Sequence, residues 1–164
     1  MSTAVTGGCQ CGAVRYRVHG ELTNPHTCHC RMCQKAAGNY FVALAQVRKS
    51  DFKLMRGEVS WFHSSDPARR GFCSRCGTPL LLETVSSPLI NVMLGSLDDP
   101  ASVKPQALYG TEAAMPWIAE ICAMSGGATE DDEIQEGVPL ADITASNHQH
   151  PDHDTAHWPP EDRR

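Results

Sequence analysis

Seven of the eight cysteines fall into three tight groups, and this clustering constrains the fold of the 164-residue chain more than any other feature. The groups are Cys9 with Cys11, then Cys28, Cys30 and Cys33, and finally Cys73 with Cys76. The eighth, Cys122, lies in an apolar stretch at 117–122 and is predicted to be a small buried hydrophobe. Cysteines in such short spacings indicate metal ligands or redox groups when the cell compartment is reducing.

The compartment is inferred from the chain's ends and its hydropathy. The N-terminal residues show no basic segment followed by an apolar run, and no stretch approaches the ~20 apolar residues of a membrane span. The length fits about one domain. We therefore expect a cytoplasmic protein with free thiols, no membrane partner and bound metal.

Zinc coordination rules divide the seven clustered thiols. Structural zinc sites use four tetrahedral ligands, whereas catalytic sites use three and leave one position for water or substrate. The division favoured here places Cys9, Cys11, Cys73 and Cys76 around a structural zinc. Cys28, Cys30 and Cys33 would then hold a second zinc with an open fourth position.

Three other arrangements stay open at this point. Cys122 or His29 could complete the second site, which would make it structural as well. Alternatively, Cys30 and Cys33 could pair with Cys73 and Cys76 as a zinc ribbon. A thioredoxin-like redox pair is less favoured because it needs a βαβ unit that this sequence lacks.

Strands dominate the predicted secondary structure. Val14, Tyr16 and Val18 alternate with arginines, as in a half-buried strand. Further strand-rich runs lie at 40–45, 52–55, 59–63, 80–84 and 89–94. Arg56-Gly57 is predicted to be a hairpin turn between two of them.

The helical elements are predicted to be short. Residues 31–37 form the best helical candidate and end at Gly38. Asp98-Asp99-Pro100 is expected to open a short turn with a carboxylate as its cap. The sequence thus predicts a mainly β protein with short helical turns.

Charge divides the chain into a body at 1–125 and an extension at 126–164. The extension carries ten acidic residues against two basic ones, including the acidic run at 130–133. It has too few large apolar groups to form its own core, so we expect it to lie loosely against the body or a neighbouring subunit. A second hypothesis is a metal site made by its histidines, which are His148, His150, His153 and His157.

Four motifs in order resemble the glutathione-dependent formaldehyde-activating enzymes, a family that includes centromere protein V. They are Gly7 to Gly12, Cys28-His29-Cys30 with Cys33, Arg70 to Cys73 with Cys76-Gly77-Thr78, and Gly95 to Pro100. The resemblance covers roughly residues 7–120. It implies a β-tent of two or three small antiparallel sheets, with the structural zinc on Cys9, Cys11, Cys73 and Cys76.

The same resemblance implies a carbon–sulfur lyase that joins formaldehyde and glutathione into S-hydroxymethylglutathione. It matches Cys28, Cys30 and Cys33 to the catalytic zinc ligands, so zinc, a thiol such as glutathione and an aldehyde are the expected cofactor and substrates. One departure is Ala107, where many relatives carry a histidine. Candidate groups for the negative charge of glutathione are Arg31, Lys35, Arg69, Arg70 and Arg75.

Other functions are weighed against this one. A zinc module without activity that binds glutathione or a protein partner is the alternative. Nucleic-acid binding is disfavoured, because residues 1–125 carry only twelve basic residues against nine acidic ones and the acidic extension would repel phosphate. Assembly into a homo-oligomer stays open.

Overall fold

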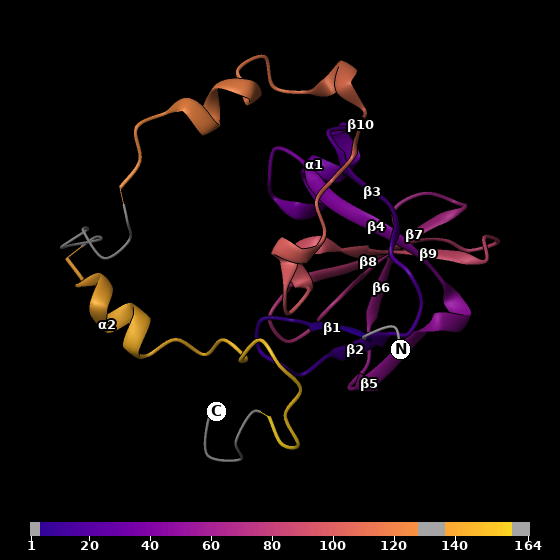
Figure 1. Cartoon of the computed structure of the whole chain (residues 1–164), viewed down its shortest axis with the longest axis horizontal. Helices are drawn as coiled ribbons and strands as arrows, with labels where there is room; N and C mark the ends of the chain where they lie inside the picture. The colour runs from indigo at the N-terminus through magenta and orange to yellow at the C-terminus, as the bar shows by residue number, and fades with distance from the viewer. Residues whose placement is uncertain (1–3, 128–136, 159–164) are drawn as a thin grey trace.

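Two β-sheets form the body of the protein in this computed structural model, which describes residues 4–127 and 137–158 (Figure 1). The smaller sheet has three antiparallel strands in the order β1 (Val5–Gly8), β2 (Arg15–Val18) and β5 (Phe52–Arg56). The larger sheet has seven strands in the order β10 (Ala107–Tyr109), β3 (Thr23–Cys28), β4 (Val42–Arg48), β9 (Leu89–Met93), β8 (Pro79–Thr84), β7 (Ala68–Phe72) and β6 (Ser60–His63).

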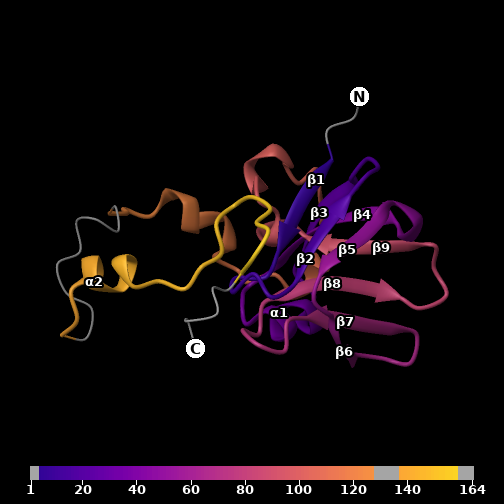
Figure 2. The same ribbon diagram turned by 90° about the horizontal axis from the view of Figure 1, so that it is seen from below.

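These sheets confirm the mainly β fold predicted from the sequence. All strand pairs are antiparallel except β10 with β3, which run parallel. The larger sheet is wider than the small sheets expected, because β10 returns from the end of the body to extend the edge at β3. Figure 2 shows the strands of the two sheets side by side in the body.

The period-two pattern of β4 separates two hydrophobic clusters. Ala45 and Val47 belong to the main core, which also contains Tyr16 and Val18 of the small sheet. Val42 and Leu44 instead belong to a second cluster with Cys33. Because successive side chains of a strand point to opposite faces, β4 contributes to the core on one face and to the cysteine-containing cluster on the other.

The predicted helix at 31–37 is confirmed as α1 (Arg31–Ala37). It ends at Gly38, whose left-handed backbone lets its N–H bond to the carbonyl oxygen of Gln34. Cys33 and Gln34 are the buried residues of α1. The helix therefore carries one of the clustered cysteines against the larger sheet.

One turn prediction is wrong, and a second is confirmed except for its cap. Arg56-Gly57 is no hairpin turn, because β5 pairs with β2 while β6 pairs with β7 in the other sheet. Gly57, at φ +70°, turns the chain from one sheet to the other. The short turn predicted at Asp98-Asp99-Pro100 is present as the 3₁₀ turn Pro100–Ser102. It has no carboxylate cap, and the Asp98 carboxylate binds Arg15 instead.

The chain after β10 leaves the two sheets through short turns at Thr111–Ala113 and Ile118–Ala123 (Figure 1). Cys122 lies in the second of these and is exposed, so the prediction that it is buried is wrong. In the second described range, 137–158, α2 (Leu140–Ala145) precedes a segment that returns to the body. The acidic run at 130–133 lies outside the described residues. No helix formed by the described residues has the length and apolar character needed to span a bilayer.

Candidate metal centres

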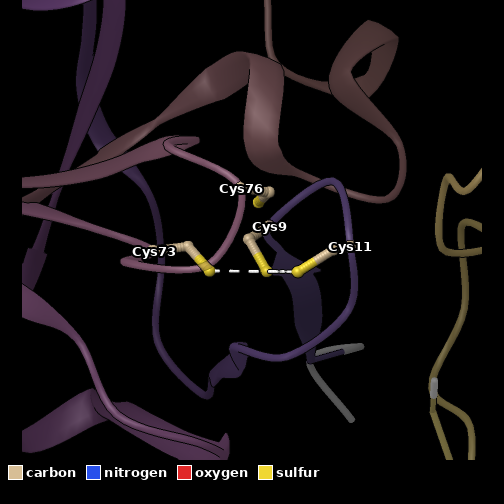
Figure 3. A group of neighbouring side chains, drawn as sticks. All are labelled: Cys9, Cys11, Cys73 and Cys76. Atoms are coloured by element: carbon tan, nitrogen blue, oxygen red, sulfur yellow. Dashed lines mark hydrogen bonds between the residues drawn. The ribbon is translucent and has the colours of Figure 1, made fainter. Parts of the chain in front are cut away.

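Two tight turns bring four cysteines together. Cys9 and Cys11 lie in the turn between β1 and β2, and Cys73 and Cys76 lie in the turn between β7 and β8. Figure 3 shows the four side chains pointing toward one another. Because each turn belongs to a different sheet, the cluster joins the small sheet to the large one.

The sulfur positions fit the geometry of a zinc ion. All four sulfurs lie within 4.8 Å of one another, with Cys9 Sγ 3.6 Å from Cys11 Sγ and Cys11 Sγ 3.9 Å from Cys73 Sγ. A tetrahedron with Zn–S bonds of about 2.3 Å has sulfur–sulfur edges of about 3.8 Å. A disulfide would need about 2.05 Å, and all four cysteines are free.

The two turns have the same pattern of backbone hydrogen bonds. Gly12 N–H donates to the Cys9 carbonyl, and Gly77 N–H donates to the Cys73 carbonyl, at 2.9 and 2.8 Å. Both glycines have positive φ, +71° and +79°, which disfavours other residues. Gln10 N–H also donates to Thr78 Oγ1 at 3.0 Å, which ties one turn to the other. The fold therefore positions the sulfurs through its own hydrogen bonds.

The second cluster contains Cys28, Cys30 and Cys33 on one short segment. Cys28 ends β3, where it pairs with Val42 of β4 and Tyr109 of β10. Cys30 immediately precedes α1 and Cys33 lies in its first turn. Their three sulfurs lie within 4.8 Å of one another. This donor set also suits zinc, with three thiols available as ligands.

Two neighbours hold this segment in place. Gln34 is buried, and its Nε2 donates to the carbonyls of His29 at 2.7 Å and Ala113 at 2.8 Å. Gly110 packs against Cys30 so closely that a Cβ atom on it would lie 2.5 Å from the Cys30 nitrogen. Neither residue was singled out from the sequence, since the contact of Gln34 with Ala113 and that of Gly110 with Cys30 depend on how β10 returns to β3.

No fourth side chain joins the three-cysteine cluster within residues 4–127 and 137–158. His29 is buried with its Nε2 3.1 Å from Thr27 Oγ1 and its ring against Phe41. Cys122 is outside the cluster too. The zinc-ribbon hypothesis is wrong, because Cys73 and Cys76 lie with Cys9 and Cys11 instead.

The histidines of the extension do not gather into a metal site either. His148, His150, His153 and His157 are all described, and none belongs to a group of three or more metal-binding side chains. His150 is instead buried, with its Nε2 2.9 Å from Thr155 Oγ1. At position 107, the alanine pairs with His26 of β3.

The thiol pKa values differ within each cluster. Burial raises the pKa of Cys28 to about 12 and also raises those of Cys9 and Cys11. For Cys76 burial acts in the same direction, but hydrogen bonds to Thr78 outweigh it and lower the pKa to about 6. For Cys30, hydrogen bonds from the backbone at the start of α1 likewise outweigh burial and lower the pKa. Cation binding must therefore displace protons from Cys9, Cys11 and Cys28.

A pocket of about 780 Å³ adjoins the three-cysteine cluster. Of the basic residues considered from the sequence, Arg31, Lys35 and Arg70 line it. Arg69 does not, because it pairs with Glu83 and stacks over Trp61. Arg75 is exposed outside the pocket. Arg70 Nη2 lies 3.5 Å from Cys33 Sγ, so this arginine connects the pocket to the cluster.

The fold and the two clusters define a class of small, mainly β proteins with cysteine sites suited to metal ions. The sequence profile of the glutathione-dependent formaldehyde-activating enzymes matches residues 4–112, which is more than half of the chain. The chain therefore belongs to that family.

Two of the proteins that resemble this chain are a sequence relative and a solved structure. A Halomonas elongata protein, named provisionally as a glutathione-dependent formaldehyde-activating enzyme, is 29% identical over 112 residues, which cover 63% of this chain and 71% of that protein. The crystal structure of a Rhodobacter sphaeroides protein has 25% sequence identity and a TM-score of 0.51, over 63% of this chain and 98% of its own. Family membership supports an enzyme role linked to glutathione and formaldehyde.

Proposed function

We propose that this protein is a zinc-dependent, carbon–sulfur lyase-type enzyme of the cytoplasm. Its substrate would be the adduct of glutathione, or another thiol, with formaldehyde or a related aldehyde. The observation that carries the proposal is a three-thiol cluster that has no fourth side-chain ligand among the described residues and lies beside a pocket lined by three basic residues. A closed structural site would need a fourth ligand and no pocket.

The two clusters would have different tasks. Cys9, Cys11, Cys73 and Cys76 would hold a structural zinc, whereas Cys28, Cys30 and Cys33 would hold the catalytic one. When bound at three cysteines, zinc supplies a positive charge that favours the thiolate form of a thiol substrate. An ordinary thiol with a pKa near 8.5 is only a few per cent ionised at neutral pH, so this gain is limited to roughly 10- to 100-fold.

Positioning by the chain's own residues must supply the rest of the rate. Glutathione carries a net negative charge, and Arg31, Lys35 and Arg70 would attract its carboxylates. Arg70 is about nine-tenths buried, and its Nη1 has no hydrogen-bond partner among the described residues. Because an unpaired buried cation is costly, an anionic ligand at Arg70 would be bound strongly.

The reaction needs no oxidant or reductant. The sulfur electron pair forms a bond to the aldehyde carbon, and the carbonyl π electrons move to oxygen. The oxygen then gains a proton, which balances the proton lost by the thiol. In the reverse direction the carbon–sulfur bond breaks and thiol and aldehyde are released, which is the lyase reaction.

Metal content and kinetics test this proposal together. We expect the purified protein to hold two zinc equivalents, one of which leaves on mild chelation with loss of glutathione binding and without loss of fold. The wild type should consume formaldehyde and glutathione faster than the spontaneous reaction, and Cys30→Ser should reduce the rate to the spontaneous one. Cys122→Ser is the matched control, since Cys122 is exposed outside both clusters.

The outcome also distinguishes an enzyme from a zinc module that binds glutathione without activity. Equal rates in the wild type and Cys30→Ser, with glutathione binding intact, would support the alternative of a zinc module without activity. A single tightly held zinc and no affinity for thiols would reject both.

A further inference from the structure

The pocket beside the three-cysteine cluster is more apolar than the adduct of glutathione and formaldehyde requires. Its volume is about 780 Å³, and it lies between α1 and strands β6 and β7. Apart from the three basic residues and Ser64, its lining side chains are nonpolar, with Met32, Phe62 and Phe72 among the largest. Formaldehyde adds only one carbon and one oxygen to the thiol, and glutathione itself consists of polar and charged groups joined by short methylene segments, so their adduct has no large apolar group to cover these side chains.

Two of the lining side chains are unusually exposed for their size. Met32 is 60% exposed and Phe62 is 63% exposed. Covering such an apolar side chain with an apolar group of a ligand is favourable, because it removes nonpolar surface from water. Both residues line one pocket, so a single apolar group of a ligand could cover both of them.

The pocket lies next to the cysteine cluster, although none of the three cysteines lines it. Val42 and Met93 line the pocket and also pack with Cys33 in one hydrophobic cluster. Arg70 lines the pocket and lies against Cys33 Sγ. A ligand whose sulfur is at the cysteine cluster would therefore extend its substituent into the apolar part of the pocket.

We infer that the enzyme acts on thiol adducts of aldehydes with an apolar alkyl or aryl group, and not mainly on the formaldehyde adduct. This inference rests on the proposed function, since it assigns the same site a substrate class. Arg31, Lys35 and Arg70 bind the carboxylates of the thiol part, and Met32, Phe62 and Phe72 contact the aldehyde's apolar group. The absence of any acidic side chain from the described lining suits an anionic ligand.

Binding of unreactive thioethers tests the inference directly. S-methylglutathione and S-hexylglutathione differ by five methylenes, and each buried methylene contributes about fourfold in affinity. Burying only two of them would raise affinity about 16-fold. We therefore expect S-hexylglutathione to bind the full-length, metal-containing protein at least 10-fold more tightly by calorimetry.

Substitutions at two exposed residues test whether the difference in affinity between the two thioethers arises in the pocket. Phe62→Ser should lower the hexyl-to-methyl affinity ratio at least threefold. Val85→Ser is the matched control, because Val85 is 48% exposed and lies outside the pocket lining, so it should keep the ratio of the wild type. A ratio in Phe62→Ser equal to that of the wild type would overturn the assignment.

The remaining outcomes separate this inference from the proposed function. Equal affinity for the two thioethers, together with formaldehyde-dependent activity, would reject the apolar substrate class and leave the proposed function standing. No binding of either thioether and no affinity for glutathione would reject both. Kinetics with hexanal and formaldehyde give a second measurement, and kcat/KM is expected to be higher for hexanal.

Discussion

Asp98 connects the loop after β9 to two strands of the small sheet. Its carboxylate accepts hydrogen bonds from both terminal nitrogens of Arg15 and from the hydroxyl of Thr6. The Arg15 side chain is 4% exposed and the Asp98 side chain 11% exposed. This buried ion pair fixes the loop after β9 to the small sheet.

Removing the carboxylate should destabilise the protein. Among the residues that the structure describes, Asp98→Asn would leave the buried Arg15 with Asp154 as its one acidic partner. Breaking a buried pair by removing one partner costs roughly 3–5 kcal/mol, and the remaining contact to Asp154 favours the lower end. Urea unfolding measures the loss, and Asp99→Asn is the control at a neighbouring position. A change below about 1 kcal/mol would contradict this account.

The same carboxylate predicts a pH dependence of stability. Burial alone would raise the pKa of Asp98, but the hydrogen bonds from Arg15 and Thr6 outweigh it and hold the pKa below its usual value. The unfolded chain therefore binds the proton first as pH falls, and the stabilisation is complete above the unfolded pKa of about 4. It is lost as pH falls further, through the folded pKa.

The measurement is the urea midpoint of the wild type and Asp98→Asn between pH 6 and pH 3. The difference between the two proteins should be constant near pH 6 and shrink below pH 4. A constant difference over the whole range would contradict the assignment to Asp98.

At the scale of elements, Gly57 decides where β5 ends and β6 begins. Its φ of +70° lies in the region that side chains disfavour, and a Cβ atom there would collide with the carbonyl oxygen of Ala13. Gly57→Ala should therefore cost more than the 1–2 kcal/mol of the backbone conformation alone, and about 3 kcal/mol is expected. Thermal unfolding measures the effect. Gly38→Ala is the control with positive φ but open space, and an equal loss in both would show that the collision adds nothing.

The returning segment at 149–158 is the second element with a testable role. His150 N–H donates to the Gln10 carbonyl at 2.7 Å, and Asp154 pairs with Arg15 and Arg17. Trp158 and His150 pack over Gly12, so the segment covers the turn that carries Cys9 and Cys11. Figure 2 shows it passing beside the small sheet. The negative extension thus binds a positive part of the body.

A chain ending at residue 146 should keep both sheets but expose this turn. One backbone hydrogen bond and two partly exposed ion pairs together are worth about 2 kcal/mol. Hydrogen exchange of the amides at 10–12 should become faster, and a chelator should remove metal from the four-cysteine cluster more quickly. A chain ending at residue 158 is the control. Unchanged exchange and release rates in the shorter chain would reject a protective role.

At the scale of the whole molecule, local patterns predicted the strands better than their partners. Runs such as 52–55 and 80–84 become β5 and β8, because strand-forming residues dominate them. β3 and β7 were not predicted, since Pro25 and Arg69-Arg70-Gly71 weaken the local signal and pairing with neighbours compensates. The predicted hairpin at Arg56-Gly57 is wrong because β5 pairs with β2, a strand far earlier in the chain, and not with β6, the next one.

At the site, too, the sequence indicated the ligand residues but not the contacts between distant segments. Ligand numbers favoured the grouping of Cys9 and Cys11 with Cys73 and Cys76, although spacing left a zinc ribbon open, and the four sulfurs lie together in the structure. The pocket was not predictable, because Met32, Phe62 and Met93 come from separate elements. Cys122 was misassigned because its apolar neighbours form a 3₁₀ turn outside the sheets.

The fold as a whole should depend on the four-cysteine cluster. The cluster connects the β1–β2 turn to the β7–β8 turn, and Cys9 and Cys73 belong to the main hydrophobic core. Structural zinc contributes on the order of 10–16 kcal/mol of apparent binding energy in small peptides, and a domain's net stability is about 5–15 kcal/mol. Cys73→Ser is therefore expected to abolish cooperative thermal unfolding.

The control for this prediction is Cys30→Ser, which changes the other cluster. Cys30 is partly exposed and lies outside the main core, so this variant should keep a cooperative transition within a few degrees of the wild type. Cobalt(II) reports on each site separately: Cys73→Ser should lose the strong absorption of tetrahedral four-thiolate cobalt, and Cys30→Ser should retain it. If Cys73→Ser melted cooperatively near the wild-type temperature, the two sheets would be held together by their apolar core and Asp98 alone, and the cluster would not be what joins them.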